Sequence, residues 1–160
     1  MATATELDIN TSATATKMAN EIFGDGTTVV SASYTGDVDS SGIYTGADTT
    51  VAGVDPADNG VILSTGDVVD FTNNSGTTNT NTSGNTSTNT SGVNGDSDFN
   101  AIAGSATYDA AFLEIDFIPD GDVLTLDFVL SSEEYPEFAS SQYNDVVGVW
   151  VNGVQAQVTI

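Results

Sequence analysis

The chain of 160 residues has no cysteine, no histidine and no arginine, and its single basic side chain is Lys17. The lack of cysteine excludes disulfides, so the fold must be held together by its core alone. The usual zinc sites are excluded, as are Ser-His-Asp triads and cysteine nucleophiles. Without arginine, the chain cannot form a bidentate phosphate clamp. These absences argue against most enzyme classes, and we expect a non-enzymatic protein.

Against this one base stand 23 acidic side chains, which give a formal net charge of −22. Nucleic acids and anionic membranes are excluded as partners, because both require Lys and Arg to neutralise phosphate. Carboxylates, amide carbonyls and hydroxyls are ligands of hard cations, above all calcium. Most of the acids are Asp, whose short side chains suit metal-binding turns in Gly-rich loops. The composition therefore indicates calcium sites, a solvating acidic surface adapted to salt, or both.

The length is typical of one domain, 1–160. Residues 73–92 contain only Asn, Thr, Ser and Gly, and we interpret them as a low-complexity insert that forms a solvated loop. The first residues have no basic region followed by an apolar run, so no secretory signal peptide is expected. No apolar run reaches the ~18 residues of a membrane span, so we expect no membrane insertion. The last residues stop within an apolar stretch, which suggests a module of a longer chain.

The hydrophobic pattern predicts a mainly β protein with one short N-terminal helix. The helix is expected within residues 12–23, where apolar residues recur at helical spacing before Gly24. Strands are expected at 27–34, 60–64, 112–118, 123–130 and 146–151. The Pro-Asp-Gly-Asp turn at 119–122 makes 112–118 and 123–130 a candidate hairpin. Many short strands with Gly/Asp turns favour a β-sandwich, and we expect a jelly-roll-like topology.

The segment from Asp37 to Asp48, DVDSSGIYTGAD, resembles a calcium loop. Counted as twelve residues, it has oxygen-bearing side chains at positions 1, 3, 5, 9 and 12 and Gly42 at position 6. It departs from the template in having Ser at position 5 and Asp at position 12, and its flanks do not look helical. We name Asp37 and Asp39 as candidate calcium ligands, with an ordinary surface loop as the alternative.

A second acidic group follows the expected strand at 123–130. Glu133, Glu134 and Glu137 lie within five residues of one another, and Asp145 follows. Adjacent carboxylates repel, so their clustering needs a cause. A bridging cation is one cause, a glycosidase-like acid/base pair is another, and splaying into water is the bland alternative. We favour a metal-binding or structural role. The acids at Asp96, Asp98 and Asp109 are expected to cap turns or to add ligands.

Four segments together resemble the choice-of-anchor L domain family of bacterial surface and secreted proteins. They are Tyr34-Thr35-Gly36 with Ser41-Gly42-Ile43, GVILSTG at 60–66, TYDAAFLEIDFIP at 107–119, and SEEYPEF at 132–138 with Asn144-Asp145. The resemblance runs from about residue 14 to the end of the chain. It implies an exported, non-enzymatic module, and the missing signal peptide is compatible with type I secretion. The insert at 73–92 and the acids between Asp37 and Asp48 depart from the family pattern.

From these observations we expect an extracellular or cell-surface bacterial module for adhesion or matrix assembly, stabilised by calcium. Its partners would be other copies of itself or cell-surface and matrix glycans. One alternative is a structural subunit that polymerises through open strand edges into a surface filament. Another is a carbohydrate-binding domain, in which Trp150, Tyr135 and Tyr143 could stack on sugars, although Trp150 within an apolar strand is more often a core residue.

Overall fold

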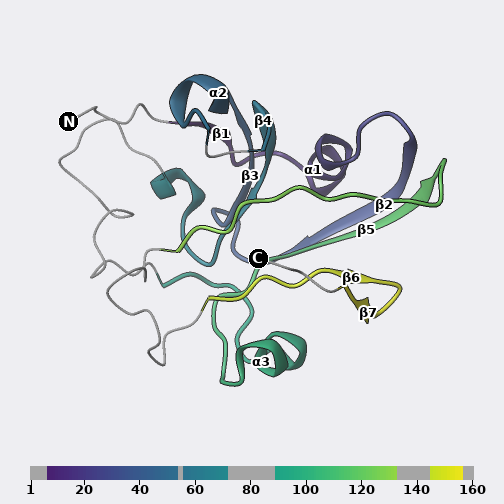
Figure 1. Cartoon of the computed structure of the whole chain (residues 1–160). Coiled ribbons are helices and arrows are strands. Elements are labelled where there is room, and N and C mark those ends of the chain that lie inside the picture. The colour runs from purple at the N-terminus through teal and green to yellow at the C-terminus, as the bar shows by residue number, and fades with distance from the viewer. Residues whose placement is uncertain (1–6, 54–55, 72–88, 133–144, 157–160) are drawn as a thin grey trace.

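The structure is a computed structural model that describes residues 7–53, 56–71, 89–132 and 145–156 (Figure 1). In chain order its elements are β1 (Asp8–Asn10), α1 (Ala15–Ile22), β2 (Thr27–Thr35), β3 (Ser41–Thr45), α2 (Ala47–Thr50), β4 (Asn59–Leu63), the 3-10 helix η1 (Val68–Phe71), α3 (Ser97–Ala103), β5 (Phe112–Pro119), β6 (Trp150–Val151) and β7 (Val154–Gln155). The described strands form three small antiparallel sheets, β1-β3-β4, β2-β5 and β6-β7.

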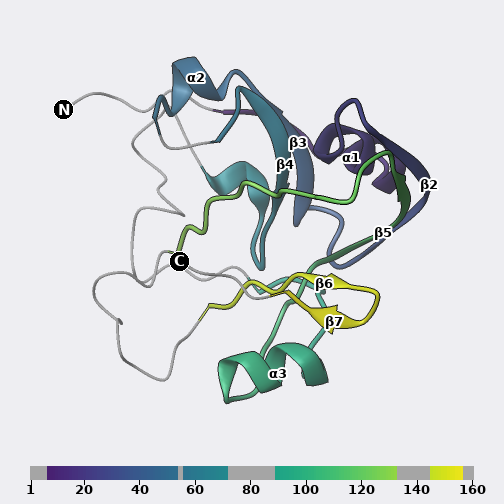
Figure 2. The ribbon, with the colours of Figure 1, turned by 45° about the vertical axis from the view of Figure 1, so that its right-hand side comes forward.

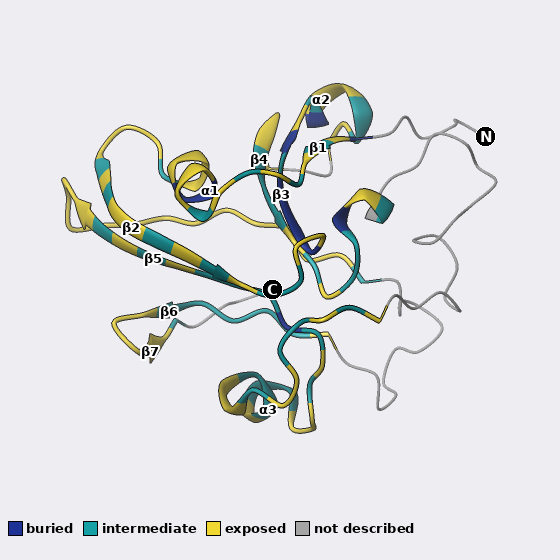
Figure 3. Cartoon of the chain, turned by 180° about the vertical axis from the view of Figure 1, so that it is seen from behind, coloured by how far each residue is buried: buried dark blue, intermediate teal, exposed yellow. Residues whose placement is uncertain are grey.

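The sheet β1-β3-β4 contains the best-buried part of the chain. Strand β3 is central and pairs antiparallel with both neighbours. Leu7, Tyr44 of β3 and Ala47 form a buried cluster. Figure 3 shows the dark blue of buried residues on β3 and at α2. Gly60 lies opposite Tyr44, and a Cβ at this glycine would come 2.5 Å from the phenolic oxygen. The position therefore requires glycine because the aromatic ring fills the space above it.

Helix α1 lies beside β2 and also contacts β3, β4 and β5, so it connects the first two sheets (Figure 2). The side chain of Thr14 caps its first turn and accepts a hydrogen bond from the N–H of Lys17 at 3.3 Å. Met18 and Ala19 point inward, with 1% and 0% of their surface exposed. At the end of the helix, the Phe23 ring packs on Phe117 of β5 with centroids 4.6 Å apart. The amphipathic pattern of the sequence thus becomes the helix-to-sheet contact.

Aromatic packing connects α3 with β5 and β6. The ring of Phe99 lies 5.1 Å from that of Phe112 and 5.5 Å, edge-on, from that of Trp150. A Cβ at Gly148 would come 2.2 Å from the Trp150 ring, so the indole also covers this glycine. Trp150 is therefore a packing residue, as its apolar strand context predicted.

Most of the predicted elements are confirmed. The chain is mainly β, with its strands in antiparallel sheets. Helix α1 confirms the N-terminal helix, and β2, β4 and β5 confirm the strands expected at 27–34, 60–64 and 112–118. The strand expected at 146–151 is present as β6, over its last two residues, and the short helices α2 and α3 were not predicted. The jelly-roll connectivity stays a prediction.

The predicted hairpin between 112–118 and 123–130 is wrong. Strand β5 pairs along its whole length with β2 instead, from Thr35↔Phe112 to Thr27↔Pro119. The N–H of Asp120 extends this pairing by donating to the carbonyl of Gly26 at 2.9 Å. The turn is thereby held against β2, and residues 123–130 return across the molecule without entering a sheet (Figure 1).

Candidate functional site

Three segments that are distant in sequence meet at the turn between β2 and β3. We call this region the Asp37 junction and define it as the turn at 36–40, the segment 64–70 that follows β4, and residues 90–92. Hydrogen bonds join all three parts. The junction contains two of the sequence-predicted ligands, Asp37 and Asp39.

The carboxylate of Asp37 is the hub of the junction. Its Oδ1 accepts the backbone N–H of Asp39 at 3.0 Å. Its Oδ2 accepts both the N–H and the hydroxyl of Ser91 at 2.7 Å. These hydrogen bonds, first that from Asp39 and then those from Ser91, lower the pKa of Asp37 below its ordinary value. Asp37 therefore attaches the end of the polar insert to the β2–β3 turn through hydrogen bonds.

Buried Ser40 connects the turn to the segment after β4. It is fully buried, and its hydroxyl donates to the carbonyl of Gly66 at 2.8 Å. Its own carbonyl accepts the N–H of Ser64 at 3.0 Å. The hydroxyl of Tyr34 donates to the carbonyl of Asp37 at 2.8 Å, and burial raises the pKa of this tyrosine. Polar side chains of the junction thus form hydrogen bonds with backbone groups of its other segments.

Two further acids, Asp67 and Asp70, bring the carboxylates of the junction to four. Asp67 accepts the N–H of Val69 at 3.1 Å at the start of η1. Desolvation, and then the negative charges of Asp70, Asp39 and Asp37, raise the pKa of Asp67. Lys17 is the chain's only basic side chain, and it lies on α1. The junction is therefore a site of concentrated negative charge.

The twelve-residue calcium loop expected from Asp37 to Asp48 does not form. Its middle is strand β3, which pairs with β1 and β4, and Asp48 lies beyond it on α2. A strand advances ~3.3 Å per residue, whereas calcium ligands must lie within ~2.6 Å of one ion. Strand formation therefore carries Thr45 and Asp48 away from Asp37. Within the described residues, no three acidic side chains converge closely enough to hold a metal ion by themselves.

Of the second predicted group, Glu133, Glu134 and Glu137 lie outside the described residues. Asp145 is described and exposed, and its Oδ2 accepts a hydrogen bond from the hydroxyl of Ser132. This hydrogen bond joins the two residues that flank 133–144. It brings together the ends of the segment that contains the Glu-Glu-Tyr-Pro-Glu-Phe motif.

The comparisons with known proteins agree with this motif. The family model of the Choice-of-anchor L domain matches residues 6–159, which is nearly the whole chain. The chain belongs to the choice-of-anchor L domain family. Searches of the curated proteins and of the solved structures found no match. Family membership makes this choice-of-anchor L domain a secreted, surface-associated bacterial module.

None of the helices in the described part of this choice-of-anchor L domain has the length and apolar character that a membrane crossing requires.

Asp96 and Asp109 of this choice-of-anchor L domain, which were expected to cap turns or to add ligands, have different surroundings. Asp96 caps helix α3 by accepting the N–H groups of Asp98 and Phe99 at 2.9 and 3.1 Å. Asp109 has a positive φ of 56° and lies against Gly92, where a Cβ would come 2.5 Å from its backbone. Its buried Oδ1 accepts no hydrogen bond from the described residues. Asp tolerates this backbone conformation better than most residues do.

Sequence reasoning missed Ser91, Thr90 and Ser40 as members of the site. The hydroxyl of Thr90 donates to the carbonyl of Thr65 at 3.0 Å, beside the two hydrogen bonds from Ser91. Both residues belong to the repetitive insert, where every position looks alike. The only available signal was the end of the repeat, because an insert must be attached where it rejoins the fold.

Proposed function

We propose that this choice-of-anchor L domain is a non-enzymatic adhesion or assembly module of the bacterial surface or matrix, and that calcium stabilises it. The observation that supports the proposal is the Asp37 junction, where the negative charges of Asp70, Asp39 and Asp37 all act on Asp67 in a chain with one basic side chain. Uncompensated repulsion of this kind destabilises the folded state. A divalent cation with oxygen ligands is the species best suited to relieve it.

The geometry favours Asp39 over Asp37 as the junction's ligand. Both oxygens of Asp37 already accept hydrogen bonds. Among the described residues, none donates a hydrogen bond to the carboxylate of Asp39 or to that of Asp70. We therefore propose Asp39 and Asp70, whose charges both act on Asp67, as ligands, with water and backbone oxygens completing the coordination of the ion. We retain Glu133, Glu134, Glu137 and Asp145 as the second proposed group of ligands.

The proposal predicts a calcium-dependent melting temperature at constant ionic strength. Calcium at one hundred times its dissociation constant stabilises a folded protein by about 2.7 kcal/mol. At about 2–4 °C per kcal/mol for a domain of this size, the melting temperature rises by about 5–10 °C relative to chelator. Equal melting temperatures in calcium, magnesium and chelator would contradict the calcium claim.

Variants separate the two groups of ligands. The double variant Asp39→Asn with Asp70→Asn should melt higher than wild type in chelator, because repulsion is relieved, and should gain less from calcium. Exposed Asp25, in the turn after α1, supplies the matched control Asp25→Asn, which should keep the full calcium response. Replacing Glu133, Glu134 and Glu137 together by Gln tests the second group in the same assay.

A further inference from the structure

Residues 123–130 form an exposed apolar segment outside the sheets. Leu124, Leu126 and Phe128 expose 46%, 47% and 39% of their surface. Among the described residues, no backbone hydrogen bond joins residues 121–131 to another segment. Among the residues that the structure describes, the segment therefore presents apolar side chains together with backbone donors and acceptors that have no hydrogen-bond partner. Contiguous exposed apolar surface of this kind marks interaction sites.

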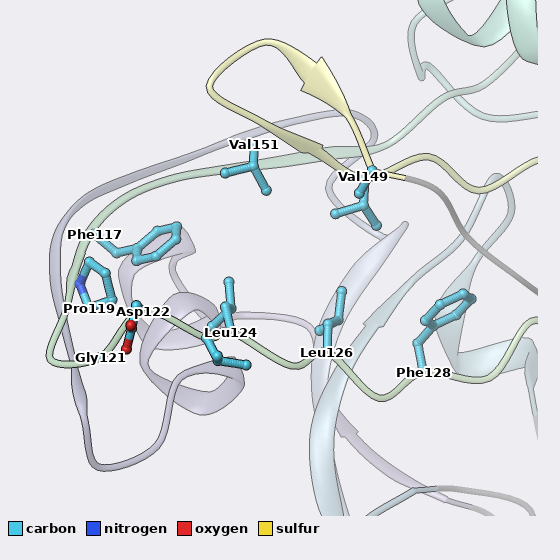
Figure 4. Close-up of a pocket in the computed structure, with 11 residues that line it drawn as sticks. Phe117, Pro119, Gly121, Asp122, Leu124, Leu126, Phe128, Val149 and Val151 are labelled. Atoms are coloured by element: carbon cyan, nitrogen blue, oxygen red, sulfur yellow. The ribbon is translucent and has the colours of Figure 1, made fainter.

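The segment forms one wall of an open groove of about 570 Å³. We call it the 123–130 groove. Its main apolar lining residues are Phe117, Leu124, Leu126, Phe128, Val149 and Val151 (Figure 4). Val123 lines the groove beside Leu124, and from Leu124 to Phe128 the lining residues alternate with Thr125 and Asp127, as in an extended chain. Figure 4 shows Leu124, Leu126 and Phe128 in a row, with Val149 and Val151 on the opposite side.

We propose that the 123–130 groove binds an extended, basic segment of another polypeptide by strand addition. A strand satisfies both features of the groove, since its backbone pairs with the free N–H and C=O groups while alternate side chains enter the apolar floor. A compact apolar ligand would leave the backbone groups unpaired. This inference deepens the proposed function, on which it rests, by naming the surface that mediates adhesion.

Charge determines which polypeptide fits. Asp122 lines the groove, and Asp120 and Asp127 flank it. The chain as a whole has a net charge of −22 with Lys17 as its only basic side chain. A second copy would bring the same charge to the interface and no cation to offset it. A segment that alternates apolar with Lys or Arg residues gains attraction where a second copy meets repulsion.

The test uses a blocked peptide that alternates lysine and valine, roughly eight residues long to match an extended segment of ~26 Å at ~3.3 Å per residue. Trp150 is the only tryptophan and precedes the lining residue Val151, so its fluorescence reports binding. All titrations are made in chelator, so a failure to bind peptide and a failure to bind calcium are observed separately. Strand formation is read from the infrared amide band of a carbonyl-labelled peptide.

We expect saturable binding, with the labelled carbonyls at a strand frequency. The double variant Leu126→Ser with Phe128→Ser should weaken it about thirtyfold, because two partly exposed apolar side chains lose their contact with the peptide. Val30 is also exposed, at 62%, and lies on β2, so Val30→Ser is the matched control and should bind as wild type does. A peptide with proline at its centre should bind weakly, since it cannot pair as a strand.

Three results would overturn the proposal. The first is equal affinity of the double variant and wild type, which would mean that charge alone attracts the peptide. The second is equal affinity for the proline-interrupted peptide, which would exclude strand addition. The third is sedimentation of the wild type as a dimer that the double variant abolishes, which would make a second copy the occupant. Melting curves of each variant, compared with wild type, show whether it is folded.

Discussion

The buried hydroxyl of Ser40 makes the sharpest test of the Asp37 junction. The side chain is 0% exposed, and its hydroxyl donates to the carbonyl of Gly66 at 2.8 Å. Ser40→Ala removes this hydroxyl and leaves the carbonyl of Gly66 without its hydrogen-bond donor. A net hydrogen bond contributes about 0.5–1.5 kcal/mol, and the half-buried Gly66 carbonyl adds part of the cost of about 1–3 kcal/mol for a buried group left unsatisfied. We therefore expect a loss of about 2 kcal/mol in the free energy of unfolding.

The measurement is urea unfolding followed by circular dichroism and by Trp150 fluorescence, at fixed calcium concentration. At about 2–4 °C per kcal/mol, the melting temperature should fall by about 4–8 °C. Ser31→Ala is the matched control, because the Ser31 hydroxyl donates to Asp116 at 2.7 Å on an exposed face. That change should cost less than about 0.5 kcal/mol. Equal losses in the free energy of unfolding for Ser40→Ala and Ser31→Ala would refute the view that the buried Ser40 hydroxyl stabilises the junction.

Three further outcomes follow from the same contacts. Asp67→Asn should raise the melting temperature at pH 7 in chelator and not below pH 3.8, because a folded pKa raised above 3.8 means that stability falls as Asp67 ionises. Ser91→Ala should raise the depressed pKa of Asp37 toward 3.8, and carboxyl NMR titration would measure it. Gly148→Ala should displace the Trp150 ring, since the new Cβ would come 2.2 Å from it; an unchanged fluorescence spectrum would contradict this packing.

The sequence was most informative where the pattern is local. Helix α1 and strand β5 follow from apolar periodicity, β2 from its β-branched residues and β4 from a short apolar run, and none of these signals needs knowledge of a partner. The pairing of these elements could not be read in the same way. Strand β5 was expected to pair with 123–130, its neighbour in sequence, but it pairs with β2. Alternation shows which face of a strand is apolar and leaves its partner undetermined.

The candidate site has the same limit. Asp37 was singled out because its spacing to Asp39 and Asp48 resembles a calcium loop, yet strand β3 occupies the middle of that loop. Its shortest hydrogen bonds among the described residues come from Ser91, 54 positions away. A local template cannot contain such a partner. The oxygen chemistry of the site was thus predictable from composition, and its assembly from three segments was not.

The attachment of Thr90 and Ser91 has a consequence for the length of the chain before them. Their hydrogen bonds to Thr65 and Asp37 return the chain to the fold close to where β4 leaves it. The sequence predicts a flexible loop for the insert at 73–92, and the closure entropy of such a loop grows slowly, by about 0.6 kcal/mol for each doubling of its length. Additional Asn-Thr-Ser-Gly tetrads, or a foreign epitope, should therefore be accommodated between Phe71 and Thr90 at little thermodynamic cost. This makes the repeat a natural insertion point for display on a bacterial surface.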